Sequence, residues 1–233
     1  MRLILTAATA LAVVAAPALA ATWQPTYRAP ARATRAQSVD STVARALAAY
    51  RKVRTIRSSF EQTLVNPITG TTATARGEMQ YQRPNRVSVR FTDPAGDRIV
   101  SDGKAVWVYL PSSAPGQVMR LPARAAAATL DPTNELLGKA RTSYTLSDAG
   151  TATIGGRAAH AVTFVPKRES EFAKAVIWVD DADALVRQFE ITDANGLVRT
   201  VRLASLAVNA KVDDSAFAFT PPAGVKIVDT TAR

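Results

Sequence analysis

The chain contains no cysteine among its 233 residues. A chain without cysteine has no disulfide, no thiol nucleophile and no cysteine ligands for a structural zinc ion. It also offers no thiol to which a lipid could be attached behind a signal sequence. A hydrophobic core must therefore stabilise the fold. With 47% hydrophobic and 21% charged residues, the composition is that of a globular protein, and one core is the simplest arrangement for this length.

Histidine is almost missing as well, since His160 is the only one. It lies in an alanine-rich apolar stretch, which favours a structural histidine over a catalytic base. Gly-x-Ser-x-Gly, phosphate-binding Gly-Lys loops and His-Glu-x-x-His do not occur. Asp180, Asp181 and Asp183 cluster without the spacing of a calcium loop, so turn chemistry explains them. We therefore expect no enzyme, no metal site and no cofactor.

Residues 1–20 have the features of a secretory signal peptide. Arg2 supplies a positive charge, residues 3–16 form an apolar run, and the small residues Ala18 and Ala20 end the segment. The alternative, an uncleaved membrane anchor, has less support because the run is short and no stop-transfer charges follow it directly. We expect cleavage after Ala20 and a soluble, exported protein.

The chain is strongly basic, with a formal net charge of +10 and a pI of about 10.4. Such a balance favours anionic partners: lipid headgroups, acidic protein surfaces or nucleic acid. Export and the lack of a dense Lys/Arg block argue against nucleic acid. Residues 21–37 carry isolated arginines and prolines without a periodic apolar pattern. We interpret them as a flexible basic leader, followed by a single domain over residues 38–233.

Periodicity predicts a mainly β (α+β) fold. Val39, Val43, Leu47 and Tyr50 recur at helical spacing, which predicts a helix over about residues 40–54. The period then changes from 3.6 to 2, and about ten or eleven antiparallel strands follow. They form one large curved sheet or an incompletely closed barrel with helices on its concave side. After the strands that start near Ile56 and end at Arg83, the predicted strands are 86–93, 98–101, 104–110, 118–121, 142–148, 151–154, 158–166, 172–180, 184–193, 197–209, a short one near residue 216 and a last one at 225–228.

Two features of this pattern are unusual. Met79 and Tyr81 lie on the apolar face of their strand, and the next residue on that face is Arg83, a charge in a core-facing position. The strands at 104–110 and 172–180 are apolar on both faces, so each side of the sheet needs a cover there.

Two short helices, predicted at 123–130 and 133–140, interrupt the strands. Their few apolar anchors, Leu130, Leu136 and Leu137, are typical of a movable cover. A container for an apolar ligand and a plain two-layer core both fit these observations.

Several segments resemble the LolA family of periplasmic lipoprotein carriers. They occur in the family's order over about residues 38–229, and the Arg-Pro and Ser-Asp-Gly-Lys pieces together are specific. The matching pieces are Phe60-Glu61-Gln62, GEMQYQRP at 77–84, VSDGKAVWVY at 100–109 followed by Pro111, Gln117-Val118, and FAFTPPAGV at 217–225.

The resemblance implies an unclosed antiparallel β-barrel of about 11 strands, with a lid of short α-helices over an apolar concave face. It also implies a function: a monomeric periplasmic carrier that takes acylated lipoproteins from an inner-membrane ABC-type exporter to an outer-membrane receptor. Arg83 matches the family arginine that bonds to the lid and takes part in hand-over. We expect the acyl-chain cavity to be lined by Phe60, Leu64, Met79, Tyr81, Val89, Phe91, Trp107, Leu130, Leu136 and Leu137.

Two alternatives stay open at this point. One is an envelope lipid-binding or stress-sensing module with the same fold. The other is a secreted enzyme acting on envelope polymers, because paired carboxylates can lie far apart in a sequence.

Overall fold

A twelve-stranded sheet makes up most of the structure, a computed structural model that describes residues 38–123, 132–170 and 172–231. The first strands are β1 (Thr55–Asn66), β2 (Thr71–Gln82), β3 (Arg86–Asp93), β4 (Ala95–Asp102), β5 (Ala105–Tyr109) and β6 (Gln117–Pro122). The later strands are β7 (Tyr144–Ile154), β8 (Arg157–Pro166), β9 (Phe172–Asp180), β10 (Val186–Asp193), β11 (Val198–Val208) and β12 (Lys226–Asp229).

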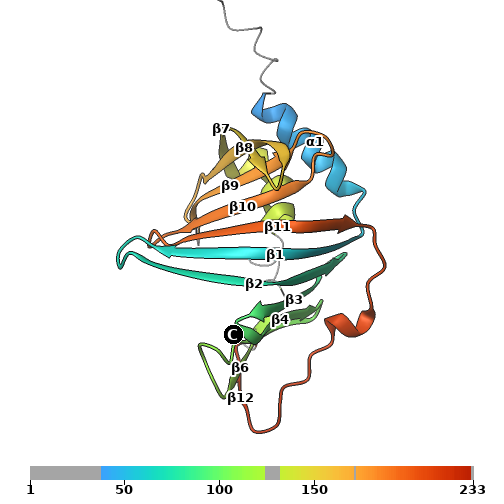
Figure 1. Cartoon of the computed structure of the whole chain (residues 1–233), viewed down its shortest axis with the longest axis vertical. Coiled ribbons are helices and arrows are strands. Elements are labelled where there is room, and N and C mark those ends of the chain that lie inside the picture. Colours follow the sequence, from blue (N-terminus) through green and yellow to red (C-terminus); the bar gives the residue numbers. More distant parts are fainter. Residues whose placement is uncertain (1–37, 124–131, 171, 232–233) are drawn as a thin grey trace, which may run out of the picture. The chain divides into compact units, whose positions relative to one another are not determined.

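The strand order is β12-β6-β5-β4-β3-β2-β1-β11-β10-β9-β8-β7 (Figure 1). All neighbours are antiparallel except β12, which pairs parallel with β6. The edge strands β12 and β7 do not pair with each other in the part of the chain that the structure describes, so the sheet is not closed. The predicted mainly β, unclosed antiparallel fold is confirmed.

Helix α1 (Val39–Arg51) packs on one face of the sheet. Ser38 caps its start by accepting a hydrogen bond from the backbone N–H of Ser41 at 3.2 Å. Val43, Ala46 and Tyr50 form its buried stripe, as the helical spacing predicts. We call the side of the sheet under α1 the helix-covered face; it carries Tyr81 of β2, Val162 and Phe164 of β8, and Ala175 and Ile177 of β9. The opposite side is the outer face.

Three local predictions need correction. The strand expected near residue 216 is a 3₁₀ helix, η1 (Asp214–Phe217), because the Asp213 side chain accepts from the backbone N–H of Ser215 and starts a turn. The strands expected at 142–148 and 151–154 are one strand, β7, with a bulge between Asp148 and Thr151. The helix expected at 133–140 is divided into α3 (Pro132–Gly138) and α4 (Ala140–Ser143).

The helix predicted at 123–130 lies, except for its first residue, outside the described residues. None of the described helices is long and apolar enough to cross a membrane.

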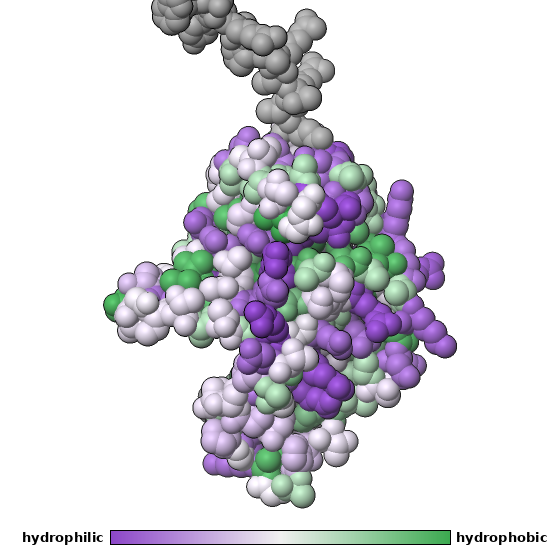
Figure 2. Space-filling view, in the orientation of Figure 1, coloured by the Kyte–Doolittle hydropathy of each residue, from purple (hydrophilic) through white to green (hydrophobic). Residues whose placement is uncertain are grey.

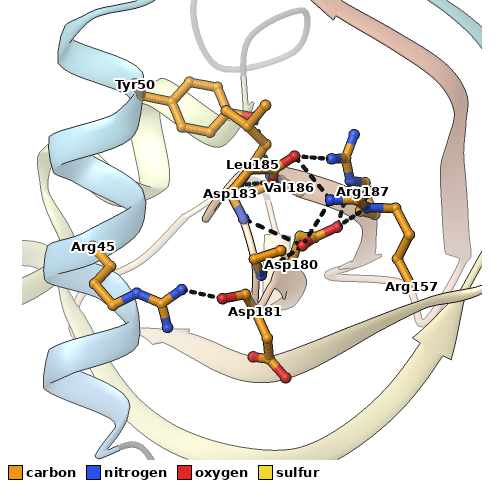
Figure 3. Close-up of polar contacts among 10 residues, drawn as sticks. Arg45, Tyr50, Arg157, Asp180, Asp181, Asp183, Leu185, Val186 and Arg187 are labelled. Atoms are coloured by element: carbon orange, nitrogen blue, oxygen red, sulfur yellow. Dashed lines mark hydrogen bonds and ion pairs between the residues drawn. The ribbon is translucent and has the colours of Figure 1, made fainter.

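A network of charges centred on the buried Asp180 fixes the turn between β9 and β10 (Figure 3). The side chain of Asp180 is 1% exposed and pairs with the guanidinium groups of both Arg157 and Arg187. Asp183 pairs with the same two arginines. Burial disfavours the ionised form of Asp180, but hydrogen bonds from Arg157, the backbone N–H of Ala182 and Arg187 outweigh it and hold the pKa of this carboxyl well below its usual range.

Removing the central carboxylate should therefore destabilise the fold. Asp180→Ala leaves the nearly buried guanidinium of Arg187 with Asp183 as its remaining partner, and we expect a loss of about 3 kcal/mol in the free energy of unfolding. Urea denaturation measures this value. The matched control is Asp214→Ala, which removes an ion pair whose carboxylate is 82% exposed and should cost less than about 1 kcal/mol. Equal losses in the two variants would contradict the assignment.

The same network predicts a pH dependence. Because the pKa of Asp180 is lower in the folded chain than in the unfolded chain, its contribution is complete above the unfolded value and is lost as the pH falls through the folded value. Below a pH of about 4, the wild type should therefore lose stability more steeply than Asp180→Asn. Parallel curves of unfolding free energy against pH would refute the role of this carboxylate.

Candidate functional site

An apolar hollow of about 80 Å³ opens on the helix-covered face, lined by residues of β1, β2, β3, β4, β10 and β11. Register explains why the residues converge. Directly paired residues of neighbouring strands point to the same face, and the pairs Met79–Val89, Val89–Ile99 and Phe189–Val201 all flank the hollow. Its lining is Phe60, Gln62, Met79, Val89, Phe91, Ile99, Phe189, Ile191, Arg199 and Val201.

Phe60 is the central side chain of this hollow. It is 5% exposed, and its ring meets that of Phe91 edge to face, with 5.4 Å between the centroids and 89° between the planes. Gly77 lies directly opposite Phe60 on β2. A Cβ at Gly77 would come within 2.8 Å of the Phe60 ring and would overlap the carbonyl oxygen of Arg90. The glycine therefore lets the ring lie close against the neighbouring strand.

The hollow borders the core beneath the helices. Met79 and Val89 contact both the group around Phe60 and the larger core that includes α1 and α3. Leu136 and Leu137 of α3, each 2% exposed, fill the helix-covered face beside it. The open hollow and the surface that Leu136 and Leu137 cover are thus neighbouring parts of one apolar face.

Most of the predicted cavity residues come together. Phe60, Met79, Val89 and Phe91 line the hollow. Tyr81, Leu136 and Leu137 lie in the adjoining core. Leu64 is half-buried farther along β1 and is not among the lining residues. Leu130 lies outside the described residues.

Trp107 requires a correction, because the structure places it on the outer face. It pairs with Val100, which pairs with Ser88, the neighbour of the inward-facing Val87. Its ring packs 5.9 Å from that of Phe219, and the guanidinium of Arg120 lies 5.4 Å from its centroid. The tail after β11 thus covers the outer side of β5, and the strand is apolar on both faces for that reason.

The sequence reasoning missed the contribution of β10 and β11. Phe189 and Ile191 share one face of a predicted strand, but periodicity does not say which strand lies beside which. The pairing of β1 with β11, more than a hundred residues later in the chain, brings Phe189, Ile191 and Val201 to the hollow.

Arg83 lies just after β2 and binds the end of α1. Its Nη2 donates to the carbonyl oxygen of Tyr50 at 2.7 Å, and its backbone N–H donates to the carbonyl of Arg54 at 2.9 Å. The residue is exposed, so the charge is not enclosed in the core. The position is favourable because carbonyls at a helix C-terminus carry partial negative charge.

Further contacts hold α1 to the sheet. Nη2 of Arg45 donates to the carbonyl of Asp181 at 2.6 Å, and the Tyr50 hydroxyl accepts from the backbone N–H of Val186 at 3.3 Å (Figure 3). At Lys52, the residue that directly follows α1, the backbone carbonyl accepts from Nδ2 of Asn209 at 3.2 Å. Long-range polar contacts therefore fasten the second half of α1 to the sheet and the segments beside it.

The remaining titratable groups of interest lie apart from the hollow. His160 is 5% exposed, with its Nε2 3.1 Å from an Asp148 carboxylate oxygen. No group of three or more His, Cys, Asp or Glu side chains that could hold a metal ion occurs within residues 38–123, 132–170 and 172–231. The site is thus an apolar surface beside α1, which polar contacts hold, and α3, which the burial of Leu136 and Leu137 holds. Such a surface suits an apolar ligand.

Comparisons with known proteins agree with this arrangement. The family model described as "Outer membrane lipoprotein carrier protein LolA" matches residues 51–220. An "Outer-membrane lipoprotein carrier protein" of Bordetella bronchiseptica is 33% identical over 240 residues, which cover 98% of this chain and 99% of that protein. A protein of the same description from Nitrosospira multiformis is 28% identical over 178 residues, covering 75% of this chain and 82% of that protein.

Solved structures are also similar in fold. An uncharacterized conserved protein from Thermus thermophilus aligns with a TM-score of 0.52 at 14% identity, covering 83% of this chain and 99% of that one. This likeness concerns the fold alone.

A charge in the hollow should abolish the binding of apolar ligands. Phe91→Asp places a carboxylate beside Phe60, and we expect it to weaken binding of the uncharged dye N-phenyl-1-naphthylamine by at least about tenfold. Fluorescence titration measures the affinity. Thr92→Asp is the matched control, because this adjacent residue is exposed and is not among the residues that line the hollow. Unchanged dye binding by Phe91→Asp would show that the hollow is not the apolar site.

Proposed function

The chain belongs to the LolA family of outer-membrane lipoprotein carrier proteins, and from this membership we propose that it is a periplasmic carrier that binds the acyl chains of lipoproteins on its helix-covered face. The observation that supports this function best is the apolar hollow around Phe60, which continues into the surface under α3. Ligand and protein then meet through apolar surface alone, and no catalytic step is needed.

The energetics favour a carrier whose lid competes with its cargo. Each buried methylene contributes about 0.8 kcal/mol, so a dozen methylenes gain roughly 10 kcal/mol. The hollow of about 80 Å³ has room for only a few water molecules. An acyl chain must therefore take over surface that Leu136 and Leu137 now cover.

Displacing these leucines lowers the net affinity. Exposing two leucine side chains costs about 3–6 kcal/mol, which offsets a large part of the gain from the acyl chain. Such a balance between an occupied state and a closed, empty state allows release at a useful rate. The element that yields is α3, since these leucines are its buried anchors and its ion pair between Lys139 and Glu135 is a local contact at the end of the helix itself.

Arg83 acts in this scheme through α1. By holding the carbonyl of Tyr50, its guanidinium keeps the last turn of α1 on the sheet, beside the surface that α3 covers. A contact between Arg83 and the lid segment at 124–131, as the family resemblance implies, concerns residues outside those described.

The route follows from the same proposal. The signal peptide is cleaved after Ala20, the leader at residues 21–37 remains with a single domain, and the monomer works in the periplasm. An ABC-type exporter of the inner membrane supplies acylated lipoproteins, and a receptor at the outer membrane accepts them. The excess of basic residues, 29 Lys and Arg against 19 Asp and Glu, suits acidic surfaces on these partners.

Purification from the periplasm under native conditions tests the function. Mass spectrometry of the purified protein should find acylated lipoproteins bound to it, and Phe91→Asp should lose them. Free phospholipid alone would instead indicate a lipid-binding or sensing module. The absence of any apolar ligand would count against every version of the proposal.

Arg83→Leu separates uptake from hand-over. The variant loses the bond to Tyr50, so the last turn of α1 is held less firmly. Because α3 packs against α1 in the closed state, that state is weakened, and we expect lipoprotein uptake at the normal level but transfer to the receptor slowed about tenfold. Arg83→Lys keeps one donor and should recover part of the rate. Arg90→Leu, an exposed arginine of β3, is the control. Normal transfer by Arg83→Leu would refute this role.

A further inference from the structure

The turn between β1 and β2 is an unusual surface. Every residue from 67 to 74 is exposed. No charged residue occurs between Glu61 and Arg76, although 21% of the chain is charged. We call residues 67–74 the hairpin tip. It projects from the sheet at the left of Figures 1 and 2, and its surface is mostly pale or green, whereas strong purple gathers on the body of the protein.

Ile68 is the outstanding residue of the hairpin tip. Its exposed fraction is 80%, against 49% for Ile227, the next most exposed large hydrophobic side chain of the described residues. A turn that only reverses the chain needs polar residues and glycine, as Asn66 and Gly70 already provide here. A single exposed hydrophobic residue is ordinary. An exposed isoleucine at the end of a projecting, uncharged hairpin is unusual and indicates a surface that contacts another apolar surface.

In the hairpin tip, backbone N–H groups are already hydrogen-bonded within the turn. Pro67 has no N–H, and the next four N–H groups along the chain all have partners. The Asn66 side-chain oxygen accepts from Ile68 at 3.0 Å and from Thr69 at 3.3 Å, and the Asn66 carbonyl accepts from Gly70 at 2.9 Å. Thr69 Oγ1 accepts from the N–H of Thr71 at 3.4 Å. Paired donors lower the cost of entering a medium of low polarity, and they also fix the direction of the tip.

The charges behind the hairpin tip suit an anionic surface. Arg76 follows the uncharged stretch on β2, and Arg199 of β11 pairs with Leu64. Glu61 is paired with Arg202. At the neighbouring turn the carboxylate of Asp193 accepts two backbone N–H groups, those of Asn195 and Leu197. The uncharged tip is thus backed by cations on a chain whose net charge is +10.

We infer that the hairpin tip is a membrane contact, in which Ile68 inserts into the interfacial layer of a phospholipid bilayer while Arg76 and Arg199 lie near its anionic headgroups. One isoleucine and a few cations give weak, reversible binding and not anchoring. This contact goes beyond the carrier function and does not depend on it, because it needs no bound lipoprotein. Of its residues, Arg199 also borders the hollow, whereas Ile68 and Arg76 do not.

Vesicle binding tests the inference. The protein purified from the periplasm is sedimented with vesicles of phosphatidylethanolamine and phosphatidylglycerol, and the bound fraction is measured against lipid concentration. We expect Ile68→Asp to weaken binding about tenfold and Ile68→Trp to strengthen it. Ile227→Asp is the matched control on the edge strand β12 and should bind like the wild type. Thermal unfolding should be unchanged in Ile68→Asp, since this side chain is almost entirely in solvent.

Several results would overturn the inference. Wild-type protein that does not bind the vesicles excludes a membrane contact. Binding that is equal in wild type and Ile68→Asp and lost in high salt would assign the contact to basic surface alone. If Ile68→Asp binds vesicles normally but transfers lipoprotein poorly to the purified receptor, the hairpin tip docks on a protein. Each of these results leaves the apolar hollow and its ligand unaffected.

Discussion

The pairing of β1 with β11 is the constraint on which the rest of the structure depends. It joins the strands β1–β6 to the strands β7–β11. The two strands share ten paired positions, from Ile56 opposite Val208 to Val65 opposite Val198. Only this pairing brings Val201, Phe189 and the strands beyond them next to Phe60. Without it, each half would be a sheet with an open apolar face, and neither half alone would form the hollow. The loop that it closes spans most of the domain, so the entropy of closure is offset only when the whole face is buried.

This constraint separates what the sequence predicts from what it does not. Alternation of apolar and polar residues and the positions of glycine and proline are local, and they predict most strands, the first helix and the mainly β fold. The neighbour of a strand and the face that a two-sided strand presents are set by distant contacts. The prediction for Trp107 is wrong because Phe219, which covers its ring, lies in a distant tail that follows the 3₁₀ helix η1. Likewise, the position of Asp180 at a turn does not predict its ion pairs with Arg157 and Arg187, because strand pairing brings these arginines to it.

Helices α1 and α3 on the apolar face are held by different interactions, and this difference bears on which helix a ligand can displace. Helix α1 is fixed by polar contacts to β10, the β9–β10 turn and the segment after β2, through Arg45, Tyr50 and Arg83. Helix α3 has seven residues and depends on the burial of Leu136 and Leu137. Apolar contacts can be exchanged for an acyl chain at little net cost, whereas the directed hydrogen bonds of α1 cannot be replaced by a hydrocarbon. We therefore propose that cargo competes with α3 and leaves α1 in place, and that Arg83, the unexpected charge just after β2, helps to hold the part that stays.

The hollow and the hairpin tip lie on the same two strands. Phe60 and Met79 contribute to the hollow from β1 and β2, and the same strands continue, paired residue by residue from Thr55–Gln82 to Asn66–Thr71, to the turn that presents Ile68. A continuous antiparallel ladder is stiff along its strands, so a contact at the tip fixes the orientation of the hollow relative to the surface that the tip touches. A carrier of acyl chains gains from this geometry, because an acyl chain that leaves the hollow near a bilayer crosses less water than one released in solution. Restricting where the hollow opens thus lowers the cost of release by the same hydrophobic effect that makes binding strong.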